Sequence, residues 1–141
     1  MSDNCFCDYY ERPTAYSERT HVARIRHACS ECGGWIAPRE RYTSVWGVWE
    51  GEVQVMKRCP DCQAVLDWMT AHQPCFCWGH TTLLSDARES MWWLNYAEHV
   101  PGMQIEMGRL LVACKRRGRI GRAERRATKD ATRLETSNAD R

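Results

Sequence analysis

The sequence predicts an α+β fold in which a small cysteine-rich module precedes two helices and a basic C-terminal tail. Three observations support this prediction: two close pairs of cysteines, a β-prone segment between them, and three later segments with helical periodicity. Of the 141 residues, 43% are hydrophobic and seven are tryptophan. This composition indicates a packed core rather than a disordered chain.

The strongest motif is C-x2-C-x26-C-x2-C, formed by Cys29, Cys32, Cys59 and Cys62. Four thiolates at this spacing match the tetrahedral, sulfur-rich coordination that zinc prefers. Glycines follow the first pair directly, which favours a tight knuckle whose backbone N–H groups turn toward the sulfurs. Because four cysteines fill the coordination shell, we expect a structural zinc ion rather than a catalytic one.

The segment between the two cysteine pairs, residues 41–58, is β-prone, and Glu50-Gly51 fits a two-residue turn at its centre. A hairpin centred on this turn brings Cys59 back to the knuckle. It also predicts three cross-strand pairs: Trp49 with Glu52, Trp46 with Val55, and Ser44 with Lys57.

Pro60 stands at a position that favours the first turn of a helix. Residues 61–72 contain no helix breaker and place apolar side chains along one face, so we expect a helix there. The positive end of its dipole favours Cys62 as a thiolate. A knuckle, a hairpin and a helix in this order are the layout of a treble-clef zinc finger, so the expected module is treble-clef-like.

Two further helices are expected, over residues 82–99 and about 103–117, on either side of Pro101-Gly102. Cys114 has helical spacing with the apolar residues of the last helix, which predicts a core residue rather than a metal ligand. From Gly118 onward there is almost no apolar stripe, and a solvated tail is expected. Residues 1–28 are expected to form an irregular arm.

These segments divide the chain into three expected parts. They are a zinc-binding module with its arm (1–80), a helical extension packed on it (81–117), and a basic tail that is flexible or partly helical (118–141). The charge is equally uneven. Residues 1–108 hold 9 Lys and Arg against 14 Asp and Glu, a net charge of −5, whereas residues 109–141 hold 11 against 4, a net charge of +7.

A second zinc site is expected from two matching CFC motifs. Its four ligands would be Cys5, Cys7, Cys75 and Cys77, which makes two separate zinc ions in all. Because CxC loops are tight, a histidine can replace one of these cysteines, and the candidates are His80, His72 and His21. Free thiols and disulfides stay open as alternatives, although thiols in a cytosolic chain are kept reduced.

The basic tail predicts nucleic-acid binding, because guanidinium groups pair with phosphates and such contacts dominate nonspecific affinity. The alternative is a solvated tail, or one that folds back onto the acidic head. The candidate residues are Lys115, Arg116, Arg117, Arg119, Arg122, Arg125, Arg126, Lys129 and Arg133.

A second hypothesis is a protein-interaction module, since exposed clusters of aromatic side chains often anchor interfaces. Core packing is the alternative use of the same side chains. The candidates are Trp46, Trp49, Trp92, Trp93 and Tyr96.

Several function classes are not supported by the sequence. There is no run of eighteen apolar residues and no secretory signal, so we expect a cytoplasmic protein without a membrane partner. The hairpin segment, residues 41–58, lacks the histidine that a treble-clef nuclease needs. No phosphate-binding, dinucleotide-binding or deaminase motif is present, so no enzyme activity and no small-molecule substrate are expected.

Six short motifs between residues 5 and 80 carry a resemblance to known proteins. They are Cys5-Phe-Cys7, His27-Ala-Cys29-Ser-Glu-Cys32-Gly33, Pro38-x-Glu40-Arg41-Tyr42, Trp49-Glu-Gly51, Cys59-x-x-Cys62 and Pro74-Cys75-Phe76-Cys77-Trp78. In these motifs the chain resembles small zinc-finger proteins of bacteriophages and prophages. The resemblance implies a fold and a phage origin, with a bacterial host cell as the location and a host protein as a further partner class. It implies no activity.

Overall fold

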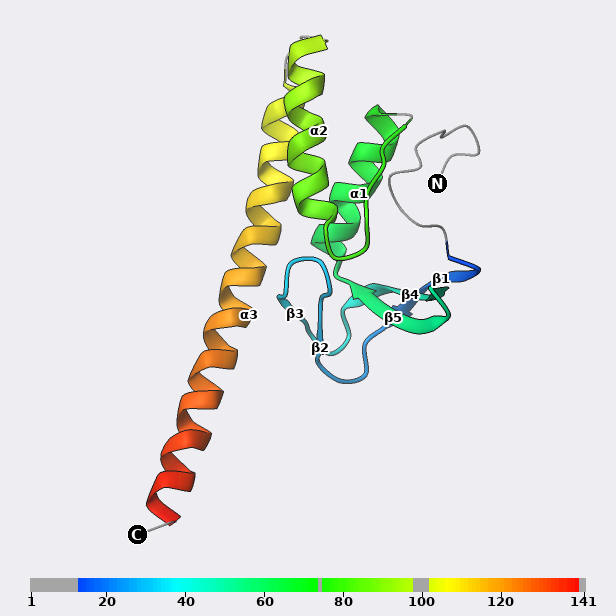
Figure 1. The fold of residues 1–141 in the computed structure, drawn as a ribbon. Coiled ribbons are helices and arrows are strands. Elements are labelled where there is room, and N and C mark those ends of the chain that lie inside the picture. The colour runs from blue at the N-terminus through cyan, green and yellow to red at the C-terminus, as the bar shows by residue number, and fades with distance from the viewer. Residues whose placement is uncertain (1–12, 74, 98–101, 140–141) are drawn as a thin grey trace.

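The computed structural model describes residues 13–73, 75–97 and 102–139, and it has the expected α+β architecture (Figure 1). A sheet and a small ribbon lie beside a group of helices, and the longest helix runs past both (Figure 1). The elements in chain order are β1 (Ala15–Val22), β2 (His27–Ala28), β3 (Trp35–Ile36), β4 (Arg41–Trp49), β5 (Glu52–Arg58), α1 (Pro60–His72), α2 (Leu83–Ala97) and α3 (Met103–Ala139).

The main sheet is antiparallel, with the strand order β1-β4-β5. Its β4–β5 hairpin has the predicted register, because Trp49 lies opposite Glu52, Trp46 opposite Val55 and Ser44 opposite Lys57. Glu50 and Gly51 both have positive φ, 49° and 80°. Two such residues match the twist of the strands that they join, so the predicted hairpin is confirmed.

The prediction that residues 1–28 form an irregular arm is wrong for residues 15–22, which form β1 along the edge of β4. This strand is exposed over most of its length, so it has little of the apolar alternation that marks a strand in sequence. The strand is instead held by backbone pairing with β4, which itself has a clear alternation of buried and more exposed residues. Residues 1–12 lie outside the described part of the chain.

The predicted knuckle is the turn that joins the short strands β2 and β3. The Cys29 N–H donates to the Gly34 carbonyl at 2.8 Å, and the Gly33 N–H donates to the Cys29 carbonyl at 3.0 Å. Gly33 has a φ of 69°, a conformation that residues with a Cβ rarely adopt. The glycines after the first cysteine pair therefore close the knuckle as expected.

Helices α1 and α2 lie where the sequence predicts them, but α3 does not end near residue 117. It continues through Gly118 to Ala139, 37 residues in all, and most of the expected tail is helical (Figure 1). None of the helices in the described residues combines the length and apolar character that crossing a membrane requires.

One core joins the knuckle to the three helices. Its buried side chains come from the four motif cysteines and from Ala23, Ile36, Val65, Leu66, Met69, Leu83, Ala87, Met107 and Cys114. A carboxylate in the knuckle extends this connection, because Glu31 accepts hydrogen bonds from the N–H groups of Thr81 and Leu83 at the start of α2. The cysteine motif therefore lies at the centre of the packing.

Candidate metal centre

The sulfurs of Cys29, Cys32, Cys59 and Cys62 lie within 4.8 Å of one another. The Sγ atoms of Cys29 and Cys62 are 3.8 Å apart, and those of Cys32 and Cys59 are 3.9 Å apart. A tetrahedral zinc ion with Zn–S bonds of about 2.3 Å separates its sulfurs by about 3.8 Å. The side chains are all buried, so the cluster has the geometry of a closed structural zinc site.

Backbone groups of the knuckle and of α1 support negative charge on these sulfurs. The Gly34 N–H donates to Cys32 Sγ and the Cys59 N–H donates to Cys29 Sγ, both at 3.3 Å. Among the four thiols, hydrogen bonds with Cys32, Cys59 and Cys62 lower the pKa of Cys29, whereas hydrogen bonds with Cys29 and Cys32 raise the pKa of Cys59. Cys59 caps the N-terminus of α1, where the helix dipole favours an anion.

Cys114 of α3 is a fifth buried thiol beside this cluster. As predicted, it packs in the core and does not belong to the group of four. Its sulfur lies 3.6 Å from Cys62 Sγ, so it contacts one ligand from outside the shell. This neighbour connects α3 directly to the metal centre.

Helix α3 lies very close to the knuckle at two glycines. A Cβ on Gly118 would lie 2.3 Å from the Cys32 carbonyl oxygen, and one on Gly121 would lie 2.8 Å from the Gly33 carbonyl oxygen. Real Cβ atoms do not approach oxygen so closely, so both positions need glycine for this packing. The spacing G-x-x-G places the two glycines on one side of the helix.

Arginines of α3 then bind the carbonyls that the knuckle turns outward. Arg122 donates to the Cys32 carbonyl at 3.2 Å, and Arg125 donates to the Gly33 carbonyl. The Arg125 guanidinium also lies over the Trp35 ring, 4.7 Å from its centroid. Buried carbonyls need hydrogen-bond donors, and α3 supplies donors to these two carbonyls of the knuckle.

Arg117 makes the densest set of polar contacts on α3. It binds both carboxylate oxygens of Glu40, at 2.9 and 2.8 Å, and it donates to Asp61 at 2.6 Å and to the Trp35 carbonyl at 2.8 Å. The hydrogen bonds to Glu40, followed by those to Asp61, raise the pKa of Arg117 despite burial. Arg117 thus joins α3 to both β3 and α1.

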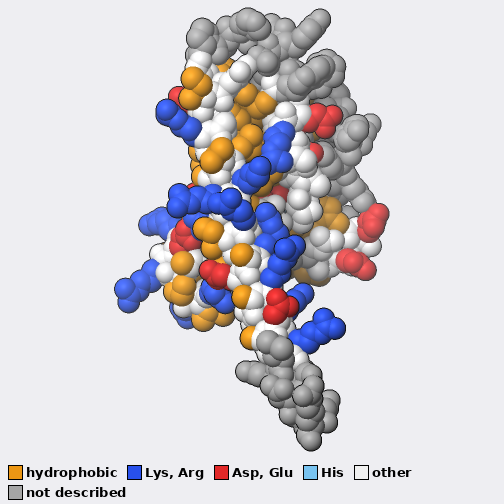
Figure 2. Space-filling view, turned by 90° about the vertical axis from the view of Figure 1, so that its left-hand side faces the viewer, with side chains coloured by type: hydrophobic (Ala, Val, Ile, Leu, Met, Phe, Trp, Pro, Cys, Tyr) orange, Lys and Arg blue, Asp and Glu red, His pale blue; other side chains and the backbone are white. Residues whose placement is uncertain are grey.

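The structure separates the predicted nucleic-acid residues into two groups. Arg117, Arg122 and Arg125 contact the knuckle, which agrees in part with the alternative that the basic segment folds onto the acidic head. The remaining six are exposed, and Lys and Arg side chains gather over α3 in the view onto this helix (Figure 2). These six are Lys115, Arg116, Arg119, Arg126, Lys129 and Arg133.

Two of the four cysteines predicted to form a second zinc site, Cys5 and Cys7, lie outside the described residues. Cys75 is exposed and Cys77 is partly buried. Among the described residues, the Cys29 cluster is the sole group of three or more metal-binding side chains with this spacing.

The three histidines proposed as replacement ligands lie against aromatic rings. His72 stacks on Trp68 and His21 lies beside Tyr42. His80 packs against Trp78, with ring centroids 4.8 Å apart, and also against Trp49 and Tyr16. Burial, and secondarily the charge of Arg58, lower the pKa of His80 to about 4.

Of the aromatic residues predicted to bind a partner, Trp46 is 41% exposed. Trp49 instead packs against Tyr16 and His80. Trp92, Trp93 and Tyr96 belong to α2, but their side chains lie outside the described part of the structure. The proposed aromatic surface is therefore reduced to Trp46 among the described side chains.

Sequence reasoning missed the contacts between α3 and the knuckle. The signal for them was the pair Gly118 and Gly121, which is unexpected inside a helix unless another backbone lies close. No family model, curated protein or solved structure matches this chain. The resemblance to phage zinc-finger proteins therefore stays a prediction, and the buried four-cysteine cluster marks the chain as a candidate zinc-binding module.

Proposed function

We propose that this protein is a non-enzymatic, zinc-scaffolded nucleic-acid-binding protein that presents a row of basic side chains along α3. The observation that carries the proposal is their spacing of 4, 7, 3 and 4 residues on one continuous helix, which keeps them on one side. We call this row the basic stripe. It consists of Lys115, Arg119, Arg126, Lys129 and Arg133.

The length and fixed direction of the basic stripe support contact with several phosphates at once. Its eighteen-residue separation, from Lys115 to Arg133, corresponds to about 27 Å along a helix. The knuckle contacts of Gly118, Gly121 and Arg125 fix the first part of this helix relative to the zinc module. A pre-organised array loses less entropy on binding than a flexible tail does.

Zinc is the ion that the centre fits best, since it accepts four thiolates in a tetrahedron and leaves no open position for a substrate. The treble-clef-like order of knuckle, hairpin and helix then serves as a scaffold. A second zinc ion bound by Cys5, Cys7, Cys75 and Cys77 belongs to the same proposal. Metal analysis of the purified protein would then give two zinc ions per chain, and a value of one would refute the second site.

The test of the main proposal is the salt dependence of binding to a short DNA duplex, measured by fluorescence anisotropy. The Arg119→Ala/Arg126→Ala double variant removes two charges from the basic stripe. If both residues contact phosphates, the slope of log K against log salt falls by about 1.8, because each phosphate contact contributes about 0.9.

The matched control is Arg88→Ala/Arg109→Ala, which removes the same charge from exposed positions outside the basic stripe. We expect it to leave the slope close to that of the wild type. Equal slopes for all three proteins, or equal losses in both variants, would contradict a specific role for the basic stripe.

A host protein as the partner stays the alternative proposal. It rests on the exposed ring of Trp46, whereas Trp49 is partly buried and packs against His80. A protein partner that is captured after nuclease treatment, and that is lost on Trp46→Ala, would favour this alternative.

A further inference from the structure

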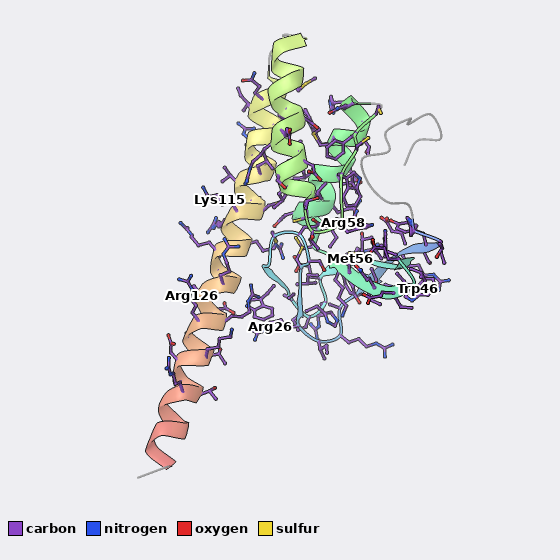
Figure 3. The ribbon with its side chains drawn as sticks, in the orientation of Figure 1. Arg26, Trp46, Met56, Arg58, Lys115 and Arg126 are labelled. Carbon is purple, nitrogen blue, oxygen red and sulfur yellow. The ribbon has the colours of Figure 1, made fainter. Side chains whose placement is uncertain are left out.

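The main sheet has one face that the described helices do not cover. Residues directly opposite in an antiparallel sheet point to the same side, so the register assigns each side chain to a face. Trp46 shares a row with Val55, the next row contains Arg19 and Lys57, and the row after that contains His21 and Tyr42. We call this side the outer face. Figure 3 shows Trp46 at the end of the sheet far from Arg126 of α3.

The opposite side of the sheet forms the core and carries its acidic residues. Thr43, Val45, Met56 and Arg58 alternate with the outer-face residues and are buried. The two acidic residues of these strands, Glu18 and Glu52, share rows with buried-side positions. The outer face therefore carries cations and aromatic rings without a carboxylate from its own strands.

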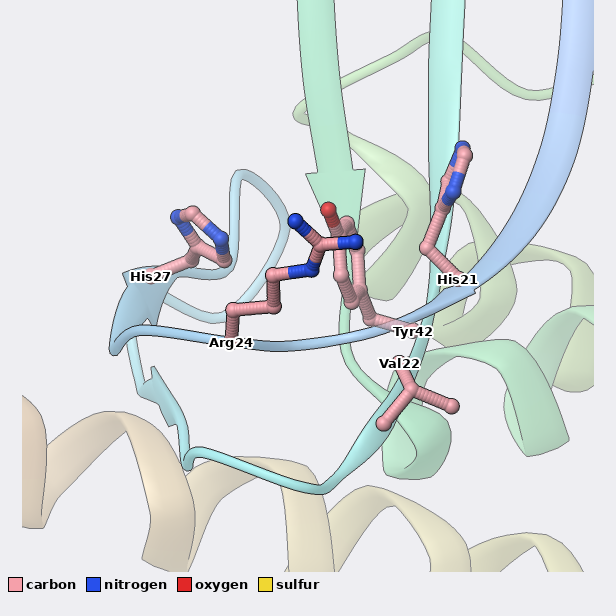
Figure 4. A pocket seen from close by; sticks show the side chains of 5 residues that line it. All are labelled: His21, Val22, Arg24, His27 and Tyr42. Atoms are coloured by element: carbon pink, nitrogen blue, oxygen red, sulfur yellow. The ribbon is translucent and has the colours of Figure 1, made fainter.

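A cavity lies at the basic end of the outer face (Figure 4). It has a volume of about 560 Å³ and is lined by His21, Val22, Arg24, His27 and Tyr42. The lining includes a guanidinium and no acidic side chain.

Lys57 adds a second permanent cation beside this cavity. Its Nζ lies 2.8 Å from His27 Nδ1 and 6.0 Å from the centre of the Tyr42 ring. An ammonium group has no lone pair to offer, so Lys57 is the donor in this contact. The cavity thus combines a ring surface with several hydrogen-bond donors suited to an anion.

We propose that the outer face binds single-stranded nucleic acid, with a base stacked on Trp46 and a phosphate held by Arg19 and Lys57. This inference deepens the proposed function, although it names a surface that is independent of the basic stripe. The inference rests on the order of the rows on this face, because the row of Arg19 and Lys57 lies between the row of Trp46 and the row of Tyr42. A single strand has the same order, with phosphates between successive bases.

The dimensions of the strand agree with this arrangement. Trp46 and Tyr42 are four residues apart on β4, which corresponds to about 13 Å along a strand. Ser44 lies between Trp46 and Tyr42 on this face of β4, and its small side chain stands in the row of Arg19 and Lys57. Arg24 and His27 extend the donors beyond Tyr42 into the cavity.

A single strand is preferred over a duplex because of the exposed ring. Aromatic side chains on open protein surfaces stack on the faces of unpaired bases, and this contact tolerates any base. In a duplex, the base faces are already stacked on one another and can gain nothing from Trp46. The basic stripe has no described aromatic side chain and is expected to bind duplex and single strand alike.

The test uses the full chain with zinc, a labelled twelve-nucleotide oligothymidylate and a twelve-base-pair duplex. We expect Trp46→Ala to weaken binding to the oligothymidylate by about 5- to 150-fold, the range of one lost base–aromatic stack. Its duplex affinity and its salt slope stay at the wild-type values, because no charge is removed. Trp46→Phe restores part of the lost affinity.

Arg19→Ala gives the complementary result. It lowers the salt slope for oligothymidylate by about 0.7, the value for one phosphate contact on a single strand. Unchanged zinc content and circular dichroism check that both variants fold, which is expected from the exposure of these side chains.

Three outcomes separate the two proposals. If Trp46→Ala binds oligothymidylate like the wild type, or weakens duplex binding equally, the outer face is not a single-strand site and this inference fails. If the Arg119→Ala/Arg126→Ala variant alone is normal, the basic stripe fails while the outer face stands. Binding of neither nucleic acid by the wild type overturns both.

Discussion

The two sides of α3 carry the same kind of residue and use it in opposite ways. On the side that faces the knuckle, the side chain of Arg117 is 21% exposed, and its guanidinium is bound to Glu40 and Asp61. Two residues further along, Arg119 is exposed. Helical position, rather than residue type, thus decides whether an arginine stabilises this fold or remains available to a ligand.

The same comparison explains why α3 is so long. Its first half shares the buried core through Met107 and Cys114, and its middle is held by glycine packing and carbonyl contacts. An isolated helix of polar residues is marginal in water. The contacts on the side of α3 that faces the knuckle therefore stabilise the helix whose opposite side carries the exposed arginines.

The largest effect is expected when the metal centre itself is removed. Structural zinc contributes about 10–16 kcal/mol to small zinc modules, which matches or exceeds the stability of a typical domain. Cys59→Ser should therefore abolish cooperative unfolding, as measured by circular dichroism during heating, and should release one zinc ion per chain.

Cys114→Ala is the matched control for this prediction, since Cys114 is equally buried and contacts Cys62 without belonging to the group of four. It should keep the zinc ion and the cooperative transition. Loss of the ion from this variant would mean that Cys114 is a ligand after all.

The next effect tests the close packing of α3 on the knuckle. Gly118→Ala places a Cβ against the Cys32 carbonyl, and overpacking of this kind costs about 1–3 kcal/mol of unfolding free energy. Gly108→Ala on the same helix meets nothing within 4 Å and should stabilise the protein by about 0.5–1 kcal/mol. Urea unfolding of both variants measures the difference, and equal shifts of the same sign would show that α3 is not held against the knuckle.

A third variant pair compares the two uses of arginine directly. Arg117→Ala leaves Glu40 and Asp61 without their shared partner and should cost about 2 kcal/mol, as expected for charged hydrogen bonds that are partly buried. Arg119→Ala should change stability by less than about 0.5 kcal/mol. Chemical unfolding at constant zinc concentration gives both values, and a cost for Arg119→Ala as large as that for Arg117→Ala would remove the distinction between the two sides.

The smallest effect concerns the ion pair between Arg26 and Glu124, which lies at the border of the two sides. The two side chains are 56% and 50% exposed, and such pairs contribute about 0–1 kcal/mol. Glu124→Ala should therefore leave the midpoint of urea unfolding almost unchanged. A shift as large as that of Arg117→Ala would mean that surface charge, rather than burial, holds α3 in place.

The local features of the fold could be predicted from the sequence because local rules determine them. Glu50-Gly51 sets the turn, the turn sets the register of the hairpin, and Pro60 sets the start of α1. The spacing of the four cysteines likewise specified the cluster that the structure brings together. In each case, the decisive residues lie within a short stretch or belong to a chelating motif.

The remaining features depend on partners that are distant in sequence. β1 forms because β4 offers it an edge, and α3 persists beyond residue 117 because Cys32 and Gly33, about ninety residues earlier, accept its arginines. Neither segment has a hydrophobic period that would reveal its structure.

The contact between Arg125 and the knuckle also has a consequence for the order of events during synthesis. The two ends of this contact, Arg125 and Gly33, are 92 residues apart. At about 5–20 residues per second, a ribosome takes about 5–18 s to add that length of chain. The cysteines can bind their metal as soon as Cys62 has emerged, but the knuckle stays uncovered until α3 follows. On the ribosome, the four cysteines are therefore complete while the knuckle surface that α3 later covers is still open to chaperones and to other chains.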